Sequence, residues 1–417
     1  MKFIHCADIH LDTPLQGLAD YEGAPVNEIR NATRRAFEKI INASVSEEIE
    51  FLLIAGDLYD TGLKSFESAL FFNKQMGILR EAGIDVYLIY GNHDAASKLI
   101  KQLRPPENVR VFRSTEPQTI LDEKNRVALH GQSFSTPNVT DDLASNYPAP
   151  ISGLFNIGLL HTNLGGSAEH ANYAPCSLDV LQNKGYDYWA LGHVHNRQIL
   201  NTNPYIVYPG NIQGRHGREL GEKSCELVSV SDAGVVSLEQ IPTSVVPWTQ
   251  VAINVAGCVT LDQVYDQVGE GFQQAVRAGG ERLVAVRLRI VGATRAYADL
   301  MRDPEGLRHQ CCSLANDYGG GLLWLERVDL AINHEAPKND MLTRDDPVGE
   351  VMRTISTLRA APESVLGWEE IVTLQKRLPL EFAEGADPIL LDVASIQIAI
   401  QEAEGLLLAR IAGLGEL

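Results

Sequence analysis

Five short apolar runs constrain the fold of the first part of this chain more than any other feature. They are rich in Ile, Leu, Val and Phe and show little alternation with polar residues. Strands with one face in water alternate, whereas strands buried on both faces form continuous apolar runs. Helical stretches separate several of the runs, which predicts a layered α/β architecture. The runs are 2–7, 51–55, 86–90, 156–160 and 188–191, with helices expected at 27–46 and 65–81.

Each apolar run ends in residues of the kind that bind metal ions. Ligands of α/β sheets bind at the carboxyl ends of the strands. We therefore expect one edge of this sheet to gather two Asp, an Asn and four or five His. The endings are Asp-Ile-His at 8–10, Gly-Asp at 56–57, Gly-Asn-His-Asp at 91–94, His161, and Gly-His-Val-His at 192–195.

The chemistry of these side chains favours a two-metal site. Carboxylate, amide and imidazole groups suit Mn²⁺, Fe²⁺ or Zn²⁺, and the lack of thiolates argues against a structural zinc site. Seven candidate ligands fit two ions that share a carboxylate, and two ions about 3.5–4 Å apart assist phosphoryl displacement. Each motif alone is weak, because an isolated His is more often an ordinary hydrogen-bonded residue. Five such motifs in order, each at a strand end, argue against coincidence.

Composition excludes several other classes of protein. The 417 residues are 45% hydrophobic and 21% charged, which is ordinary for a globular protein and unlike a disordered or collagenous one. No apolar run approaches the roughly 20 residues that a membrane span needs, and the N-terminus does not resemble a signal peptide. The six cysteines are scattered and form no CxxC pair, so we expect reduced thiols. We expect a soluble cytoplasmic protein.

The net charge limits how this chain could meet a nucleic acid. Lys and Arg number 35 against 54 Asp and Glu, which gives a net charge of −19, and both 1–245 and 246–417 are acidic. Any contact with nucleic acid must then be local, metal-bridged or shared with a partner. The chain has no GxxxxGK[ST] motif, so any ATP dependence would come from that partner.

The pattern of predicted elements changes twice along the chain. Short strands at 206–243 predict an antiparallel end to the first domain, which we place at 1–245. Strands and a helix in 246–340 predict a small α+β domain, and an acidic stretch followed by Pro347 predicts a helix start in a third region, 341–417. Apolar residues at helical spacing then form one stripe: Val393, Ile396, Ile400, Ala403, Leu407 and Ile411.

The order D-x-H, GD, GNHD, H and GHxH resembles that of the calcineurin-like metallophosphoesterase superfamily. The opening FIHCADIHLD and GDLYD at 56–60 look like the DNA-repair nucleases of the SbcD and YhaO type. Phosphoprotein phosphatases of the superfamily typically continue GD-x-x-D with Arg-Gly and have GNHE, and this chain has neither. The resemblance is close over 1–245. It implies a layered α/β sandwich with a small α+β capping domain and C-terminal helices.

The resemblance assigns seven residues to two divalent ions, with Mn²⁺ expected. Three hold the first ion, three hold the second and one bridges the pair: Asp8, His10 and His195, then Asn92, His161 and His193, with Asp57 between them. It further implies that His93 protonates or stabilises the leaving oxygen and that Asp94 orients His93. A hydroxide bridging the ions would attack phosphorus in line.

The implied function is that of a DNA exonuclease in DNA repair, with single-strand endonuclease activity left open. A loop following the last motif, 208–218, carries Arg215, His216 and Arg218, which could contact backbone phosphates. Alternatively, it is a glycine-rich turn with solvated charges. Two other readings stay open for the whole chain: an enzyme acting on phosphomonoesters or small nucleotides, and a non-catalytic adaptor for an ATPase.

The resemblance also implies partners. Nucleases of this kind use C-terminal helices to grip the coiled coil of an SMC-like ATPase, and they commonly form homodimers. The stripe at 393–411 could serve this purpose, or it could simply pack on its own domain. We therefore expect DNA, an SMC-like ATPase and a second copy of the chain as partners.

Overall fold

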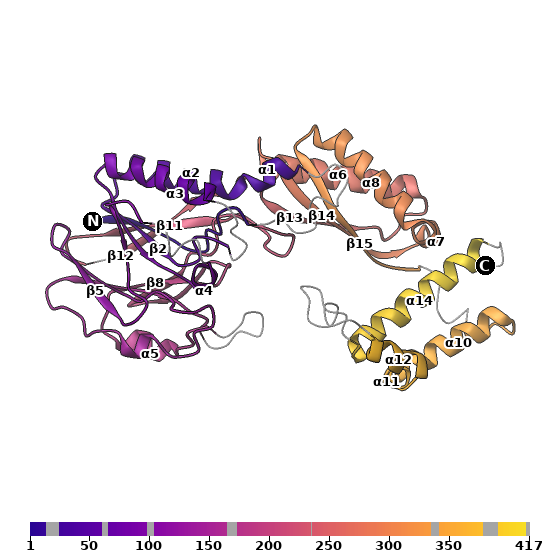
Figure 1. The fold of residues 1–417 in the computed structure, drawn as a ribbon. Coiled ribbons are helices and arrows are strands. Elements are labelled where there is room, and N and C mark those ends of the chain that lie inside the picture. The colour runs from indigo at the N-terminus through magenta and orange to yellow at the C-terminus, as the bar shows by residue number, and fades with distance from the viewer. Residues whose placement is uncertain are drawn as a thin grey trace. The chain divides into compact units, whose positions relative to one another are not determined.

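The computed structural model describes residues 1–13, 25–60, 66–97, 104–164, 173–234, 236–334, 342–377 and 391–413. The chain divides into two compact units (Figure 1). The first comprises Met1–Thr249 with Ala278–Val286, and the second comprises Gln250–Arg277 with Arg287–Leu417. The expected division at 245 and 340 into three domains stays a prediction. In the described part of the chain, no helix is long and apolar enough to cross a membrane.

Two six-stranded sheets form the first unit. The first sheet has the order β12-β11-β1-β2-β3-β4 and the second has the order β5-β6-β7-β8-β10-β9. The strands of the first sheet are β1 (Lys2–Cys6), β2 (Phe51–Ala55), β3 (Asp85–Ile89), β4 (Val109–Val111), β11 (Ser224–Val230) and β12 (Val236–Pro242). Those of the second are β5 (Gln118–Asp122), β6 (Val127–Gly131), β7 (Phe155–His161), β8 (Tyr188–Gly192), β9 (Gln198–Thr202) and β10 (Tyr205–Tyr208).

All five predicted strands are present, but they belong to two sheets. β1, β2 and β3 run parallel in the first sheet, and β7 and β8 run parallel in the second. The expectation of one sheet edge was therefore wrong. A continuous apolar run shows that both faces of a strand are covered, but it does not show what covers each face. The antiparallel pairing of β1, β11 and β12 confirms the expected antiparallel end.

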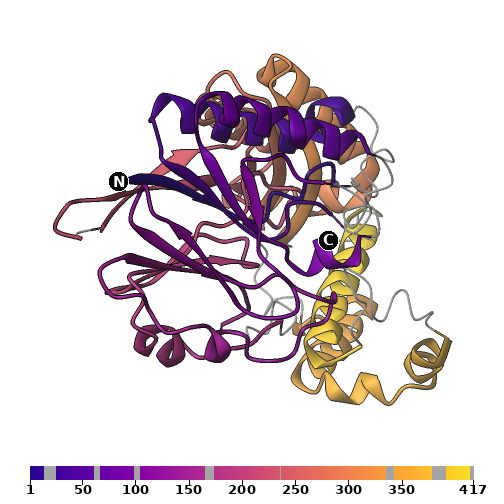
Figure 2. The same ribbon diagram turned by 60° about the vertical axis from the view of Figure 1, so that its left-hand side comes forward.

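The core of the first unit lies between the sheets. Phe3 of β1 stacks on Phe51 of β2, with ring centroids 5.0 Å apart, and meets Tyr188 of β8 edge-on at 5.4 Å. Helices cover the outer face of the first sheet and account for the other apolar side of its strands (Figures 1 and 2). These helices are α1 (Val26–Arg30), α2 (Ala32–Ser46) and α3 (Glu67–Glu81). The unit also contains α4 (Asn92–Ala96) and α5 (Leu178–Asn183).

A three-stranded sheet and a set of helices make up the rest of the fold. The sheet has the order β13-β14-β15, with β13 (Trp248–Asn254), β14 (Val284–Thr294) and β15 (Leu323–His334). Its helices are α6 (Leu261–Gly279), α7 (Tyr297–Arg302) and α8 (Pro304–Gly319). The C-terminal helices are α10 (Pro347–Ala360), α11 (Glu363–Leu366), α12 (Glu369–Arg377) and α14 (Val393–Gly413).

The predicted helix start near 347 is confirmed. The Asp346 side chain accepts a hydrogen bond from the Gly349 backbone N–H at 2.9 Å, and Pro347 occupies the first turn of α10. In α14, the predicted stripe is only partly covered. Ile396 and Ile400 are buried, whereas Val393 and Leu407 are each 41% exposed.

Candidate metal centre

The loops that follow β1, β2, β3, β7 and β8 meet at one place. Backbone hydrogen bonds join the first two loops: Asp8 N–H donates to Gly56 O at 3.1 Å, and His10 N–H donates to Asp57 O at 3.0 Å. The carboxylates also accept backbone hydrogen bonds. His193 N–H lies 3.0 and 3.1 Å from the two oxygens of Asp8, and His93 N–H donates to Asp57 Oδ1 at 3.0 Å. The two sheets are thus tied together through the candidate ligands.

Four of the candidate ligands have left-handed backbone conformations. Their φ angles are 50° at Asp8, 47° at His10, 52° at Asp57 and 100° at His193. Such angles are uncommon for residues other than glycine and cost of order 1–3 kcal/mol each. Strain of this kind persists where the surrounding structure enforces it, and it clusters at functional sites. These four residues lie in the turns that carry the candidate ligands.

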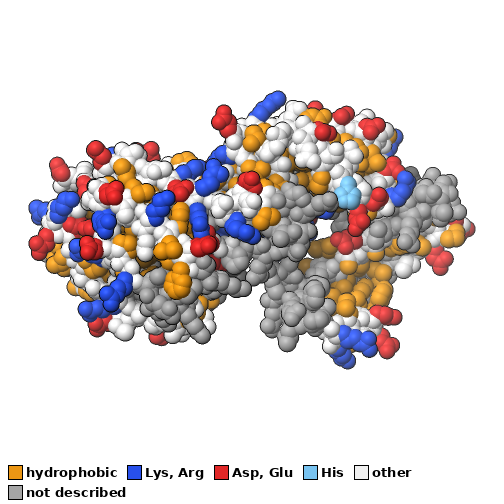
Figure 3. Space-filling view, turned by 45° about the horizontal axis from the view of Figure 1, so that its top comes forward, with side chains coloured by type: hydrophobic (Ala, Val, Ile, Leu, Met, Phe, Trp, Pro, Cys, Tyr) orange, Lys and Arg blue, Asp and Glu red, His pale blue; other side chains and the backbone are white. Residues whose placement is uncertain are grey.

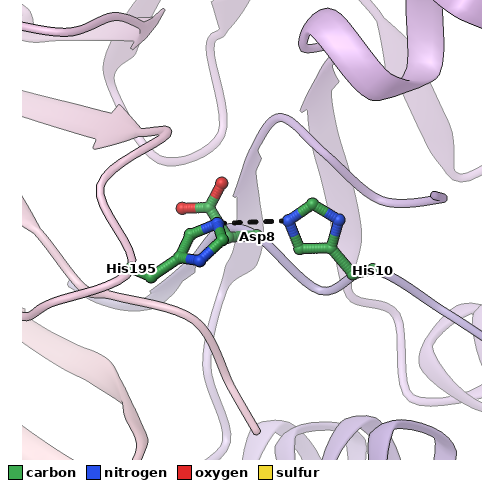
Figure 4. A group of neighbouring side chains, drawn as sticks. All are labelled: Asp8, His10 and His195. Atoms are coloured by element: carbon green, nitrogen blue, oxygen red, sulfur yellow. Dashed lines mark hydrogen bonds between the residues drawn. The ribbon is translucent and has the colours of Figure 1, made fainter. Parts of the chain in front are cut away.

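The first group of ligand atoms comes from Asp8, His10 and His195 (Figure 4). His10 Nε2 lies 3.3 Å from His195 Nε2, and the His10 side chain has no exposed surface. Burial lowers the pKa of His10, so its ring is neutral. Two imidazole nitrogens that face each other beside a carboxylate form a donor set for a divalent cation.

The second group comes from Asp57, His161 and His193, with Asn92 beside them. His161 Nδ1 lies 3.0 Å from Ala55 O, and because a carbonyl only accepts, Nδ1 carries a proton. His161 Nε2 then faces two oxygens: Asn92 Oδ1 at 3.0 Å and Asp57 Oδ2 at 3.4 Å. A lone pair on Nε2 would repel these oxygens unless a proton or a metal ion lies between them.

Asp57 lies between the two groups. The same oxygen, Oδ2, is 3.4 Å from His161 Nε2 and 3.8 Å from His10 Nε2. Burial alone would raise the pKa of Asp57, but the neighbouring imidazoles outweigh burial and lower it to about 2. Burial alone would likewise lower the pKa of His161, but Asp57 raises it to about 9. The buried negative charge of Asp57 is unfavourable without positive charge close by, and the donor set around it fits divalent ions.

Two glycines make the close packing of this centre sterically possible. A Cβ on Gly91 would overlap Asp57 Oδ1 and the ring of His161, and a Cβ on Gly192 would overlap the carbonyl of Ala55. Glycine is required at both positions because a side chain would not fit, and not because of the backbone conformation, since neither residue has a positive φ angle. The glycines that precede Asn92 and His193 therefore let the two sheets approach each other at their carboxyl ends.

His93 lies beside the candidate ligands with a different partner from the one expected. Its Nδ1 is 3.1 Å from Asp60 Oδ1, and its ring meets His10 edge-on at 4.8 Å. Its side chain is 30% exposed. Burial opposes protonation of the ring, but the hydrogen bond with Asp60 outweighs burial and raises the pKa of His93. His93 is thus a partly accessible imidazole that Asp60 keeps closer to the protonated form.

The expectation that Asp94 orients His93 was wrong. The Asp94 carboxylate accepts hydrogen bonds from the backbone N–H groups of Leu58, Tyr59 and Gly91, at 3.1, 2.9 and 3.0 Å. It therefore holds the loops after β2 and β3 together. The resemblance implied this role for Asp94, which follows His93 directly, but adjacent residues on a helix point in different directions. Asp60 takes the orienting position instead.

The loop after the last motif brings one of its three candidate residues to the centre. Arg215 is 13% exposed at its side chain, and its Nη2 lies 3.1 Å from Glu219 Oε1 while its Nη1 lies 3.6 Å from Asp60 Oδ2. His216 and Arg218 lie on the surface. Glu219, 2.7 Å from His195 Nδ1, was missed by the sequence analysis, although it follows the loop that was singled out.

Comparisons with known proteins agree with this geometry. Residues 1–197 match the calcineurin-like phosphoesterase family, and residues 248–333 match the middle domain of the metallophosphoesterase YhaO. The chain belongs to the calcineurin-like metallophosphoesterases. It is 36% identical over 310 residues to the metallophosphoesterase YhaO of Bacillus subtilis strain 168, and the match covers 73% of this chain and 75% of that one. Within its class, the chain is a metallophosphoesterase of the YhaO type.

Two further relatives are more distant. The SbcD component of the nuclease SbcCD from Staphylococcus epidermidis is 26% identical over 241 residues, which cover 51% of this chain and 61% of that protein. The DNA double-strand break repair protein Mre11 of Methanopyrus kandleri is 24% identical over 240 residues, which cover 51% of this chain and 48% of that protein. The predicted superfamily and fold class are confirmed, and the family is one of metal-dependent phosphoester hydrolases.

Proposed function

We propose that this protein is a DNA phosphodiesterase of DNA repair that works with two divalent metal ions, as an exonuclease and as an endonuclease on single strands. The observation that carries the proposal is the position of Asp57, whose Oδ2 lies within 4 Å of imidazole nitrogens in both ligand groups. A shared carboxylate is what a two-metal phosphoesterase needs. The names of the SbcCD and Mre11 relatives support DNA as the substrate.

Seven residues would hold the two ions. Asp8, His10 and His195 would bind one ion, and Asn92, His161 and His193 would bind the other, with Asp57 shared. When bound, such ions lower the pKa of water and stabilise negative charge on phosphoryl oxygens. The mixed oxygen and nitrogen donors, without thiolates, suit Mn²⁺, Fe²⁺ or Zn²⁺, and the resemblance to nucleases of the SbcD and YhaO type makes Mn²⁺ the ion we expect.

The remaining polar side chains would handle protons and charge. His93 would give its proton to the oxygen that leaves phosphorus, because its ring is accessible and Asp60 favours the protonated form. Arg215 would contact a phosphate oxygen, because its guanidinium group reaches the edge of the centre. His216 and Arg218, which are exposed on the same loop, would meet the DNA backbone further out.

An ATPase partner would supply basic surface to complement this acidic chain, whose net charge is −19. Figure 3 shows Lys and Arg interspersed with Asp and Glu on the face in view, without a single-sign basic patch there. The C-terminal helices offer the partner a site. An apolar groove runs between α10, α11, α12 and α14, and its lining includes Trp368, 46% exposed, and Leu407, 41% exposed. A coiled-coil segment of an SMC-like ATPase would fit such a groove.

A cleavage assay with Mn²⁺ tests the proposed function. We expect the purified chain to cleave end-labelled duplex or single-stranded DNA, and the His93→Ala variant to cleave it far more slowly with unchanged metal content. A chromogenic phosphodiester and a chromogenic phosphomonoester are assayed in parallel. Preference for the monoester without DNA cleavage, including after addition of the ATPase, would overturn the proposal in favour of a small-substrate enzyme. If the chain hydrolysed none of these substrates, the result would favour the alternative of a non-catalytic adaptor for an ATPase.

A further inference from the structure

Glu219 lies at the edge of the candidate metal centre, and the proposed function gives it no role. It is 7% exposed and follows the loop that carries Arg215. We propose that Glu219 is a positioning residue that fixes His195 toward its metal ion and Arg215 toward the substrate phosphate. This inference rests on the proposed two-metal function, because it assigns the residue that orients one of the ligands.

Both oxygens of Glu219 are fully engaged. Oε1 lies 2.7 Å from His195 Nδ1 and 3.1 Å from Arg215 Nη2. Oε2 accepts from Asn211 Nδ2 at 2.8 Å and from the Arg215 backbone N–H at 2.8 Å. A carboxylate has about four acceptor positions, so these four donors satisfy it. One buried side chain thus links a predicted ligand to the residue expected to contact phosphate.

The contact with His195 determines which ring nitrogen can bind metal. Glu219 Oε1 only accepts when ionised, so the contact at 2.7 Å places the proton on His195 Nδ1. The lone pair of the neutral ring is then on Nε2, the nitrogen that lies 3.3 Å from His10 Nε2 inside the ligand group. Arg215 Nη2 also lies 3.2 Å from His195 Nδ1, but it is a donor facing a donor and its acceptor is Glu219. Metal-binding imidazoles are commonly oriented by a carboxylate in this way.

The loop that carries Glu219 is itself held by buried hydrogen bonds. Gln213 Oε1 accepts from the backbone of Val245 at 2.8 Å and Val246 at 3.2 Å, and Gln213 Nε2 donates to the Gly214 carbonyl. Trp248 Nε1 donates to the same carbonyl at 2.9 Å. Because these groups are buried, breaking their hydrogen bonds is unfavourable, and the position of Glu219 is enforced by the fold. A positioning residue needs such support.

Metal binding to the Glu219→Gln variant tests the proposal. Gln has the same shape but replaces one carboxylate oxygen with an amide donor. We expect Mn²⁺ titration calorimetry to show two ions bound by the wild type, and one of them bound about 10–100-fold more weakly by the variant, as for other residues that orient ligands. Glu222→Gln is the matched control, since Glu222 is exposed and pairs with Arg282, away from the ligands.

The His195→Ala variant identifies which of the two ions the Glu219→Gln change weakens, because it removes a ligand of one ion. If Glu219 acts through His195, adding Glu219→Gln to His195→Ala should weaken that site little further, because the two changes act on one unit. Far-UV circular dichroism and thermal unfolding verify that each variant is folded. Equal Mn²⁺ affinities, within twofold, for wild type and a folded Glu219→Gln variant would overturn the inference while leaving the two-metal proposal intact. A wild type that binds no Mn²⁺ would overturn both.

Discussion

The pair of His93 and Asp60 is the most direct link between this structure and a proton-transfer step. Asp60 raises the pKa of His93 against the effect of burial, so more of the imidazole is protonated near neutral pH. The neighbouring Asp94 is occupied by three backbone N–H groups and is not placed to do the same. Asp60 lies in the loop after β2 and Asp94 lies in α4, and neutralising each of them should have different consequences.

Asp60→Asn should lower the pKa of His93, because the amide removes the negative charge that favours the imidazolium. If His93 donates a proton, the alkaline limb of the activity profile moves to lower pH and activity at pH 8 falls. A pH–rate profile on a chromogenic phosphodiester measures the shift. His93→Ala, which removes the donor, should lower turnover by about 10²–10⁴-fold at unchanged metal content. An unshifted limb in a folded Asp60→Asn variant would contradict this assignment.

Asp57 should control both metal ions at once. Its Oδ2 lies near imidazoles of both ligand groups, whereas Asp8 belongs to one group only. We therefore expect Asp57→Ala to lose both ions on dialysis, and Asp8→Ala to lose mainly one. Inductively coupled plasma mass spectrometry of the dialysed proteins gives the metal-to-protein ratio. One ion still tightly bound to Asp57→Ala would argue against a shared carboxylate.

The residue types of the candidate centre could be read from the sequence, but their mutual contacts could not. Asp8, His10 and Asp57 were predicted from their positions just after apolar runs. The direction of a side chain after a strand depends on the backbone of the turn, and here these residues have positive φ angles that no sequence pattern indicates. For the same reason Asp60 and Glu219, two further carboxylates that contact imidazoles of the centre, were not given that role.

Strands were the most predictable elements, because their burial on both faces leaves a strong pattern. All five predicted runs coincide with strands to within about one residue at each end. The pairing of those strands into two sheets was not predictable, since it depends on which apolar faces meet. β1 illustrates the point: Phe3 faces the other sheet and packs on Tyr188, whereas Ile4 turns to the opposite face.

A titratable residue within β1 should make the stability of the first unit sensitive to acid. His5 is fully buried between the sheets, where Tyr188 Oη lies 3.0 Å from Nδ1 and Leu191 O lies 3.2 Å from Nε2. Burial lowers its pKa to about 3, and the hydrogen bond to Leu191 opposes this only in part. The unfolded chain, with a pKa of about 6.5 for His, binds the proton more readily. Stability is therefore lost as pH falls from about 6.5 toward 3.

His5→Gln removes this titration while keeping a polar side chain of similar length. In metal-free protein, we expect the free energy of unfolding of the wild type to fall more steeply below pH 6.5 than that of the variant, with a difference of about 1 kcal/mol per pH unit. Urea unfolding at pH 7, 6 and 5 measures both slopes. Parallel slopes for the two proteins would show that His5 is protonated in the folded state as well.

On the scale of the whole molecule, net charge and apolar surface are the features behind the proposed partner. The net charge of −19 opposes long-range attraction to DNA, and the metal ions would offset it only locally. Four residues of the predicted stripe line the groove between the C-terminal helices: Ile396, Ile400, Ala403 and Leu407. Exposed apolar grooves of this kind mark sites of protein interaction.

Charge placed in the groove should abolish binding of the proposed ATPase partner without unfolding the chain. Trp368→Glu and Leu407→Glu alter exposed side chains that line the groove, whereas Ile398→Glu alters a residue of α14 that is 59% exposed and does not line it. We expect the first two variants to lose binding to a coiled-coil segment of an SMC-like ATPase in a calorimetric titration, and Ile398→Glu to retain it. Because the metal centre lies in the other compact unit, hydrolysis of a chromogenic phosphodiester should be unchanged in all three. Equal loss of binding with Ile398→Glu would show that the effect comes from added charge rather than from the groove.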